Sequence, residues 1–216
     1  MGRIRRPAVA RLPLRPMDEI APGLWHWTAR RESIGSEVSS YYLESERVLI
    51  DPMTPSEGLE WLERHGPPQH AILTNRHHDR DAWRLGDAFG CTVHCIRNGL
   101  FELEGRGPVE AFDFGDELPG EISVHEVDAI CPDETALYIP RHRALACADG
   151  VVRGHRGELE FVPDFLMDEP EQTKRGLREA YRGLLELRFD LLLLAHGEPV
   201  VGGARDALRA FVDGRG

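Results

Sequence analysis

The sequence lacks the features that would place it in a membrane or on nucleic acid. No apolar run approaches the ~20 residues that a membrane-spanning helix needs. Acidic residues outnumber basic ones by 37 to 26, and the net charge of −11 disfavours binding to nucleic acid or to an anionic membrane. We therefore expect a small-molecule substrate or ligand as the partner, with no nucleic acid and no membrane.

Cysteines are also few, and their spacing predicts no zinc site. Cys91 and Cys95 enclose a histidine in CTVHC, but no second cysteine pair completes four ligands. We expect all four cysteines to be free thiols and interpret Cys91 and Cys95 as buried structural ones. Residues 1–16 contain five arginines and no acid, without the apolar core or cleavage site of a secretory signal. We expect a flexible or surface-wrapping tail at 1–16, and a reducing, cytoplasmic location.

Hydrophobic periodicity predicts runs of strands with helices between them. In TPSEGLEWLERHG, Thr54 is predicted to cap a helix, with Pro55 at its first position and Glu57 closing a capping box. This order favours mixed sheets covered by helices, within one large domain at 17–216. Strands are predicted at 24–30, 37–44, 47–51, 71–74, 91–95, 121–127, 135–139, 144–149 and 190–196, and helices at 54–66, 80–90, 171–187 and 204–212.

Four residues that can bind a metal ion stand at or near predicted strand ends. His77 and Asp79 follow the strand at 71–74, Asp149 ends the strand at 144–149, and His196 ends the strand at 190–196. Imidazole and carboxylate are ligands of zinc, iron and manganese, and such an ion makes water nucleophilic near neutral pH. This chemistry hydrolyses an ester, amide, thioester or phosphodiester. Because Asp149 and His196 each precede a glycine, a purely structural role in turns is the competing interpretation.

Five segments follow one another in a recognisable order: MDEIAPGLWHW, SYYLESERVLIDPMTPSEGLEWL, AILTNRHHDRD, DETALYIPRHRALACADG and LLLLAHG. Together they resemble the metallo-β-lactamase superfamily from about Met17 to the C-terminus. The resemblance implies a four-layer αββα sandwich, in which helices flank two mixed β-sheets. Members of this superfamily are commonly binuclear metallohydrolases with a leading Thr-His-x-His-x-Asp-His motif.

The leading motif is incomplete in this chain. Thr74, His77 and Asp79 match it, whereas Asn75 and Arg80 stand where histidines belong. Of the later family ligands, the bridging aspartate corresponds to Asp149 and the final histidine to His196. The remaining metal histidine falls at Ile130, with Cys131, Asp128 and Glu134 as neighbouring candidates.

Two hypotheses follow from this incomplete motif. In the first, a hydrolase carries at most one divalent ion (zinc, iron or manganese) on Asp79, Asp149 and His196, with His77 nearby. Asp79 and Arg80 are then the catalytic candidates, because Arg80, or Arg76, could stabilise an oxyanion or anchor an anionic substrate.

In the second hypothesis the protein carries no metal and is a binding or scaffold protein, or an enzyme that uses other chemistry. Arg80 would lie between Asp79 and Asp149 and replace the charge of the ion through paired hydrogen bonds. Another arrangement is open under either hypothesis, because side-chain directions in this loop do not follow from the sequence: Arg80 points away, and His78 or Asp81 turns into the site.

Overall fold

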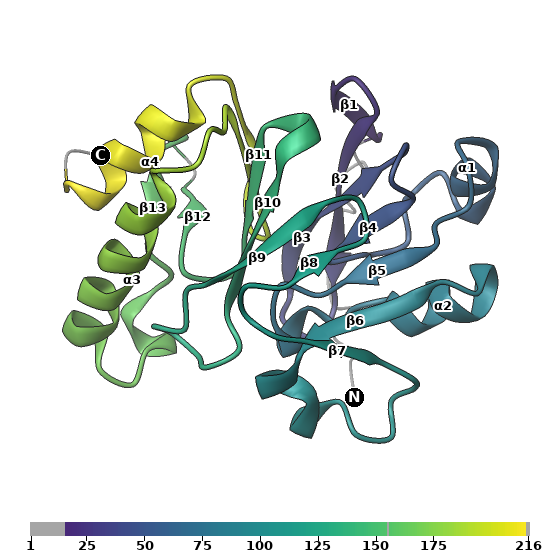
Figure 1. Ribbon diagram of the computed structural model, residues 1–216, viewed down its shortest axis with the longest axis horizontal. Helices are drawn as coiled ribbons and strands as arrows, with labels where there is room; N and C mark the ends of the chain where they lie inside the picture. The colour runs from purple at the N-terminus through teal and green to yellow at the C-terminus, as the bar shows by residue number, and fades with distance from the viewer. Residues whose placement is uncertain (1–15, 155, 215–216) are drawn as a thin grey trace, which may run out of the picture.

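The protein is described by a computed structural model that covers residues 16–154 and 156–214. Its elements form four layers, which Figure 1 shows from left to right as helices α3 and α4, one sheet, a second sheet, and helices α1 and α2. The expected αββα sandwich of two mixed sheets is therefore confirmed. The predicted tail lies almost wholly outside the described residues.

The first sheet has seven strands paired in chain order. The pairs up to β4 are antiparallel, and those from β4 to β7 are parallel. Helices α1 (Leu59–Arg64) and α2 (Ala82–Phe89) lie in the connections between the parallel strands and cover the outer face. The strands are β1 (Asp18–Ala21), β2 (Leu24–Arg31), β3 (Ser36–Leu43), β4 (Val48–Ile50), β5 (His70–Ile72), β6 (Thr92–Ile96) and β7 (Glu110–Phe112).

The second sheet has the order β15-β14-β11-β10-β9-β8, and only β11 and β14 pair in parallel within it. Helices α3 (Pro170–Leu184) and α4 (Ala204–Val212) cover its outer face. Its strands are β8 (Glu117–Leu118), β9 (Ile122–Glu126), β10 (Thr135–Ile139), β11 (Ala144–Cys147), β14 (Leu191–Leu194) and β15 (Val200–Val201). A separate hairpin joins β12 (Val152–Arg153) to β13 (Leu159–Glu160), and the 3₁₀ turns are η1 (Arg76–His78), η2 (Arg97–Glu102), η3 (Pro140–His142) and η4 (Asp164–Leu166).

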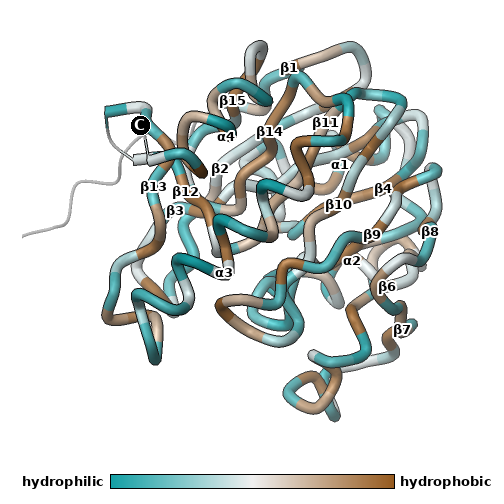
Figure 2. Tube along the Cα trace, turned by 60° about the vertical axis from the view of Figure 1, so that its left-hand side comes forward, coloured by the Kyte–Doolittle hydropathy of each residue, from teal (hydrophilic) through white to brown (hydrophobic). Residues whose placement is uncertain are grey.

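Strand β14 shows how the sequence places the core. Leu191 and Leu193 belong to the cluster between the sheets, whereas Leu192 and Leu194 pack under α3 and α4. Successive side chains on a strand point to opposite faces, so an unbroken apolar run is the pattern of a strand covered on both sides. Figure 2 shows the same concentration of hydrophobic residues along β4, β10 and β14.

The first predicted helix begins later than its capping signals indicate. It begins at Leu59, after Gly58 in a positive-φ conformation (φ 80°). Thr54 instead donates from both its backbone N and its Oγ1 to Oδ2 of Asp81, each at 2.7 Å. Because a tertiary partner takes the hydroxyl, the loop after β4 is joined to the start of α2, and no capping box forms.

Two further predictions concern the thiols and the membrane. All four cysteines are free, and Cys91, Cys95 and Cys147 are buried, as structural thiols usually are. Across the described residues, the helices are too short and too polar for any of them to cross a membrane.

Candidate metal site

The candidate site lies where four strand ends meet between the two sheets. Strands β4 and β5 run in parallel, so Asp51 and the segment from Thr74 to Arg80 leave the same edge of the first sheet. Strands β11 and β14 are parallel in the second sheet, which brings Asp149 beside His196. Such loop clusters at the carboxyl ends of parallel strands are common positions for binding sites.

Three side chains converge at this point: His78, Asp149 and His196. Oδ1 of Asp149 lies 3.3 Å from Nε2 of His78 and 3.1 Å from Nε2 of His196. One ligand atom from each residue lies within 4.8 Å of the other two. His78 is 3% exposed, whereas the side chains of Asp149 and His196 are 23% and 26% exposed. The group is therefore closed on the His78 side and reaches solvent on the other.

The ring of His78 is held from behind by Asp51 and Thr74. Nδ1 of His78 lies 2.9 Å from Oδ2 of Asp51 and 2.8 Å from Oγ1 of Thr74. Thr74 itself donates to Asp51 from both its backbone N and its hydroxyl, at 2.8 and 2.7 Å. Because Asp51 accepts at Nδ1, a proton is held on that nitrogen of His78, and Nε2 points toward Asp149.

The electrostatics make His78 a cation when no metal is bound. Burial opposes its charge, but the carboxylates of Asp51 and then Asp149 outweigh burial and raise the pKa of His78 to about 9. Burial likewise opposes the charge of Asp149, yet His78 and His196 hold the pKa of this carboxyl well below its usual range. An imidazolium thus lies between two carboxylates.

His78 falls at the variable position between His77 and Asp79 in the family motif, and the local backbone explains why it reaches the site. Asn75 caps the 3₁₀ turn η1, and its Oδ1 accepts from the backbone N of His77 at 3.0 Å. Side chains at i and i+3 align on a 3₁₀ turn, so Asn75 and His78 face the same way. Nδ2 of Asn75 donates to Oδ2 of Asp149 at 2.8 Å. Of the two residues that could turn into the site in place of Arg80, His78 does so in the structure. Asp81 binds Thr54 instead.

Two predicted ligands from the leading motif lie outside this group. The side chain of His77 is 53% exposed and its Nδ1 faces Glu102 at 3.8 Å. Asp79 is held by two guanidinium groups, Arg31 at 2.9 Å and Arg106 at 3.1 Å. Of the four predicted ligands, the structure thus brings together Asp149 and His196.

Arg80 does not form the predicted bridge between Asp79 and Asp149. Its guanidinium donates to backbone carbonyls instead: Nη1 to Ser39 and, at 2.7 Å, to Asp51, and Nη2 to Ala195 at 3.4 Å. Burial lowers the pKa of Arg80, against the attraction of Asp51 and then Asp149. Arg80 therefore ties the two sheets together behind the site, and its charge acts on these carboxylates from there.

The loop before β10 also supports the site without joining the group. Arg76 pairs with Asp133 through its guanidinium and its backbone N, so Arg76 is engaged within the protein. Glu134 is fully buried, and its Oε1 accepts from the backbone N of Gly150 at 2.6 Å. Burial, followed by the charge of Asp149, raises the pKa of Glu134 well above its usual range.

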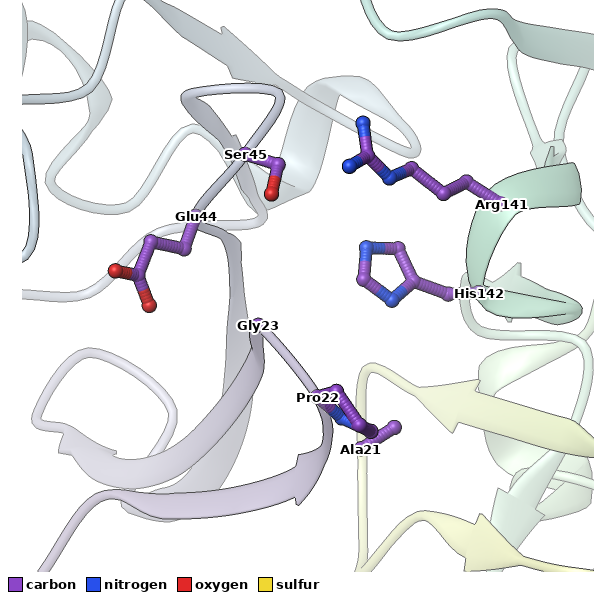
Figure 3. A pocket seen from close by; sticks show the side chains of 7 residues that line it. All are labelled: Ala21, Pro22, Gly23, Glu44, Ser45, Arg141 and His142. Atoms are coloured by element: carbon purple, nitrogen blue, oxygen red, sulfur yellow. The ribbon is translucent and has the colours of Figure 1, made fainter.

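A cavity of about 590 Å³ lies elsewhere in the molecule. Figure 3 shows the residues that line it. Arg141 and His142 of η3 project across it toward Ser45 in the β3–β4 turn. This turn precedes β4 and η3 precedes β11, whereas Asp51 and Asp149 follow these strands. The cavity is therefore at the opposite end of the sandwich from the candidate site.

Comparison with known proteins identifies the fold. The chain has the metallo-β-lactamase fold, and structural likeness is what establishes it. No family model matches the chain, and no curated protein matches it in sequence.

Three solved structures illustrate this likeness. The DIM-1 metallo-β-lactamase has 15% identity and a TM-score of 0.68, covering 94% of this chain and 98% of its own. A metallo-β-lactamase from Erythrobacter litoralis has 16% identity and a TM-score of 0.65, covering 91% and 94%. Rubredoxin oxygen:oxidoreductase from Desulfovibrio gigas has 15% identity and a TM-score of 0.64, and the chain spans 61% of its length.

Proposed function

We propose that the protein is a metal-dependent hydrolase of a small molecule, with one divalent ion held by His78, Asp149 and His196. The observation that carries this proposal is the convergence of three ligand atoms within 4.8 Å. Two ligands each about 2.1 Å from a tetrahedral ion lie roughly 3.4 Å apart. The Nε2–Oδ1 distances of 3.3 and 3.1 Å fit that spacing.

The donor set fits the chemistry as well as the spacing. Two imidazoles and one carboxylate form a ligand set of catalytic zinc and of non-haem iron, and they leave further coordination positions open. When bound, such an ion lowers the pKa of its water and polarises a carbonyl or phosphoryl oxygen. The partial exposure of Asp149 and His196 gives a substrate access to that side.

The surrounding residues orient these three ligands. Asp51 holds the proton of His78 on Nδ1, which leaves the Nε2 lone pair for the ion. Asn75 occupies Oδ2 of Asp149 and leaves Oδ1 to face the two imidazoles. An ion that binds here must displace the proton shared between His78 and Asp149, so we expect affinity to rise with pH.

The test measures the metal content of variants. These variants distinguish a site formed by His78, Asp149 and His196 from one that uses Asp79 of the sequence motif. Untagged protein, purified without chelators and soaked with zinc, manganese or iron, should retain about one ion per chain after dialysis. Asp149→Asn and His196→Gln should retain far less. Asp79→Asn is the matched control and should retain as much as the parent, since its carboxylate binds two arginines.

The hydrolase activity needs its own measurement. Ester, thioester, amide and phosphodiester substrates should be screened with the metal-loaded protein. Activity that a chelator removes and the metal restores, and that Asp149→Asn lacks, would support the proposal. Only trace metal after every soak, or equal metal loss in Asp79→Asn, would refute it.

A metal-free binding or scaffold protein is the second candidate, and the position of His78 favours it. Both ring nitrogens of His78 face a carboxylate oxygen, at 2.9 Å from Asp51 and 3.3 Å from Asp149. In this version the imidazolium of His78 replaces the charge of the ion, and the guanidinium of Arg80 lies behind it. The earlier hypothesis assigned this role to Arg80 alone. A protein that binds no metal but loses stability in His78→Gln would support this candidate.

A further inference from the structure

A second pair of imidazoles lies on the first sheet, away from the candidate site. His70 begins β5, and His94 lies on the neighbouring parallel strand β6 as the register partner of Ile72. His70 and Ile72 are two residues apart and share a face, so His70 and His94 share it too. Nδ1 of His70 lies 3.0 Å from Nε2 of His94, and the ring planes are inclined by 48°.

This spacing fits two neighbouring ligands on one ion. Two nitrogens each about 2.1 Å from an ion and at a right angle to each other lie roughly 3.0 Å apart. Right angles are the geometry of tetragonal copper and nickel, and copper has the highest affinity among divalent first-row metals. We propose that His70 and His94 form a separate transition-metal site, which takes Cu²⁺ before Ni²⁺ and Zn²⁺, with water at the remaining positions.

Glu110 supports this interpretation from the next strand. It is the register partner of His94 across β6 and β7, and its Oε2 lies 3.8 Å from Nδ1 of His94. Metal-binding histidines usually direct their other ring nitrogen to a carboxylate or carbonyl. The carboxylate of Glu110 favours the proton on Nδ1 through its charge, at a distance too long for a hydrogen bond. Nε2 of His94 then accepts the hydrogen bond from Nδ1 of His70, and an ion that binds both nitrogens takes the place of that proton.

The burial of the pair keeps both rings in a state that can bind metal. Burial lowers the pKa of His70, and burial together with His70 lowers that of His94, so burial favours the uncharged form of both rings. The side chain of His94 is 7% exposed and that of Glu110 is 71% exposed, while His70 is half-buried. An ion can therefore enter from the His70 side.

The pair is separate from the group around His78. His70 stands at the start of β5, and the first residues of the candidate site follow the end of that strand. Four residues of extended chain from His70 to Thr74 span roughly 13 Å. One ion cannot contact both groups, so copper binding here and hydrolysis there can be tested independently.

The test uses untagged Asp149→Asn/His196→Gln protein, in which the first site is disabled. Copper(II) chloride is titrated and followed by calorimetry and by electron paramagnetic resonance. We expect one Cu²⁺ per chain with hyperfine coupling to two nitrogens. His70→Ala and His94→Gln should each weaken copper binding more than tenfold and remove one nitrogen from the spectrum.

Two further variants sharpen the result. Glu110→Gln should weaken binding by about tenfold, as removal of a carboxylate that orients a ligand does. His125→Ala is the matched control, since His125 is also a half-buried strand histidine but lies beside the Ser123 hydroxyl. Circular dichroism checks that each variant is folded. Copper affinity unchanged in His70→Ala, or reduced equally in His125→Ala, would overturn the proposal.

Discussion

Raising the pH should destabilise the metal-free protein by deprotonating His78. The pKa of this residue is raised from 6.5 to about 9, because Asp51 and Asp149 outweigh the effect of burial. A difference of this size corresponds to roughly 3 kcal/mol of folding free energy. The contribution is complete below about pH 6.5, where folded and unfolded chains are both protonated, and is lost as the pH rises through 9.

The measurement is the free energy of unfolding of the parent and of His78→Gln in a chelator, at pH values from 6.5 to 9.5. Glutamine has no titrating group and leaves two carboxylates without a cation between them, so the variant is less stable at neutral pH. We expect the gap between the two proteins to narrow by about 3 kcal/mol across this range. Other titrating groups contribute equally to the free energies of unfolding of both proteins and cancel in their difference. Cys91 is one such group, since burial raises its pKa to about 11.

A gap that stays constant with pH would show that His78 is neutral in the folded protein and carries no charge between Asp51 and Asp149. Saturating zinc supplies a second check. Because the ion displaces the proton at Nε2, the zinc-loaded parent should no longer lose stability between pH 6.5 and 9.

Three substitutions around the site have distinct expected outcomes. Arg80→Met should lower the free energy of unfolding by at least about 3 kcal/mol in a denaturant titration, because buried carbonyls lose their donor. Glu134→Gln should stay within about 1 kcal/mol of the parent at pH 7, whereas Glu134→Ala should lose about 2 kcal/mol or more, because only the amide can still accept from Gly150. Gly150→Ala should lower the melting temperature and the metal content together, since a Cβ there would lie 2.5 Å from Leu177 and from the Tyr181 hydroxyl.

The fold could be predicted from sequence where side-chain periodicity alone decides the structure. The apolar run at 190–196 predicts a strand covered on both faces, and β14 has its leucines in two separate clusters. The start of α1 could not be predicted in the same way. Thr54 carries a capping signal, but Asp81, 27 residues further on, takes its hydroxyl. A local signal fails when a distant partner competes for the same group.

The same distinction between local patterns and distant partners applies to the residues of the candidate site. Asp149 and His196 could be found because they end strands, and parallel pairing brings those ends together. His78 could not be placed, because its direction depends on the 3₁₀ turn that follows Asn75. Asp79 matches the family motif in sequence, but Arg31 lies 48 residues before it and holds its carboxylate. No local pattern contains that pairing.

The difference between arginine and histidine explains which half of the site we expect to keep a metal. Asp79 is paired with the guanidinium groups of Arg31 and Arg106, and a guanidinium has no lone pair to offer a metal, so an ion there would meet two cations. Asp149 is paired with two imidazoles instead. An imidazolium can lose its proton to solvent and offer the freed lone pair to the ion, so a divalent cation takes the place of the proton beside the same carboxylate. Arg31 and Arg106 thus argue against a second ion near Asp79, while a single ion near Asp149 remains compatible with them.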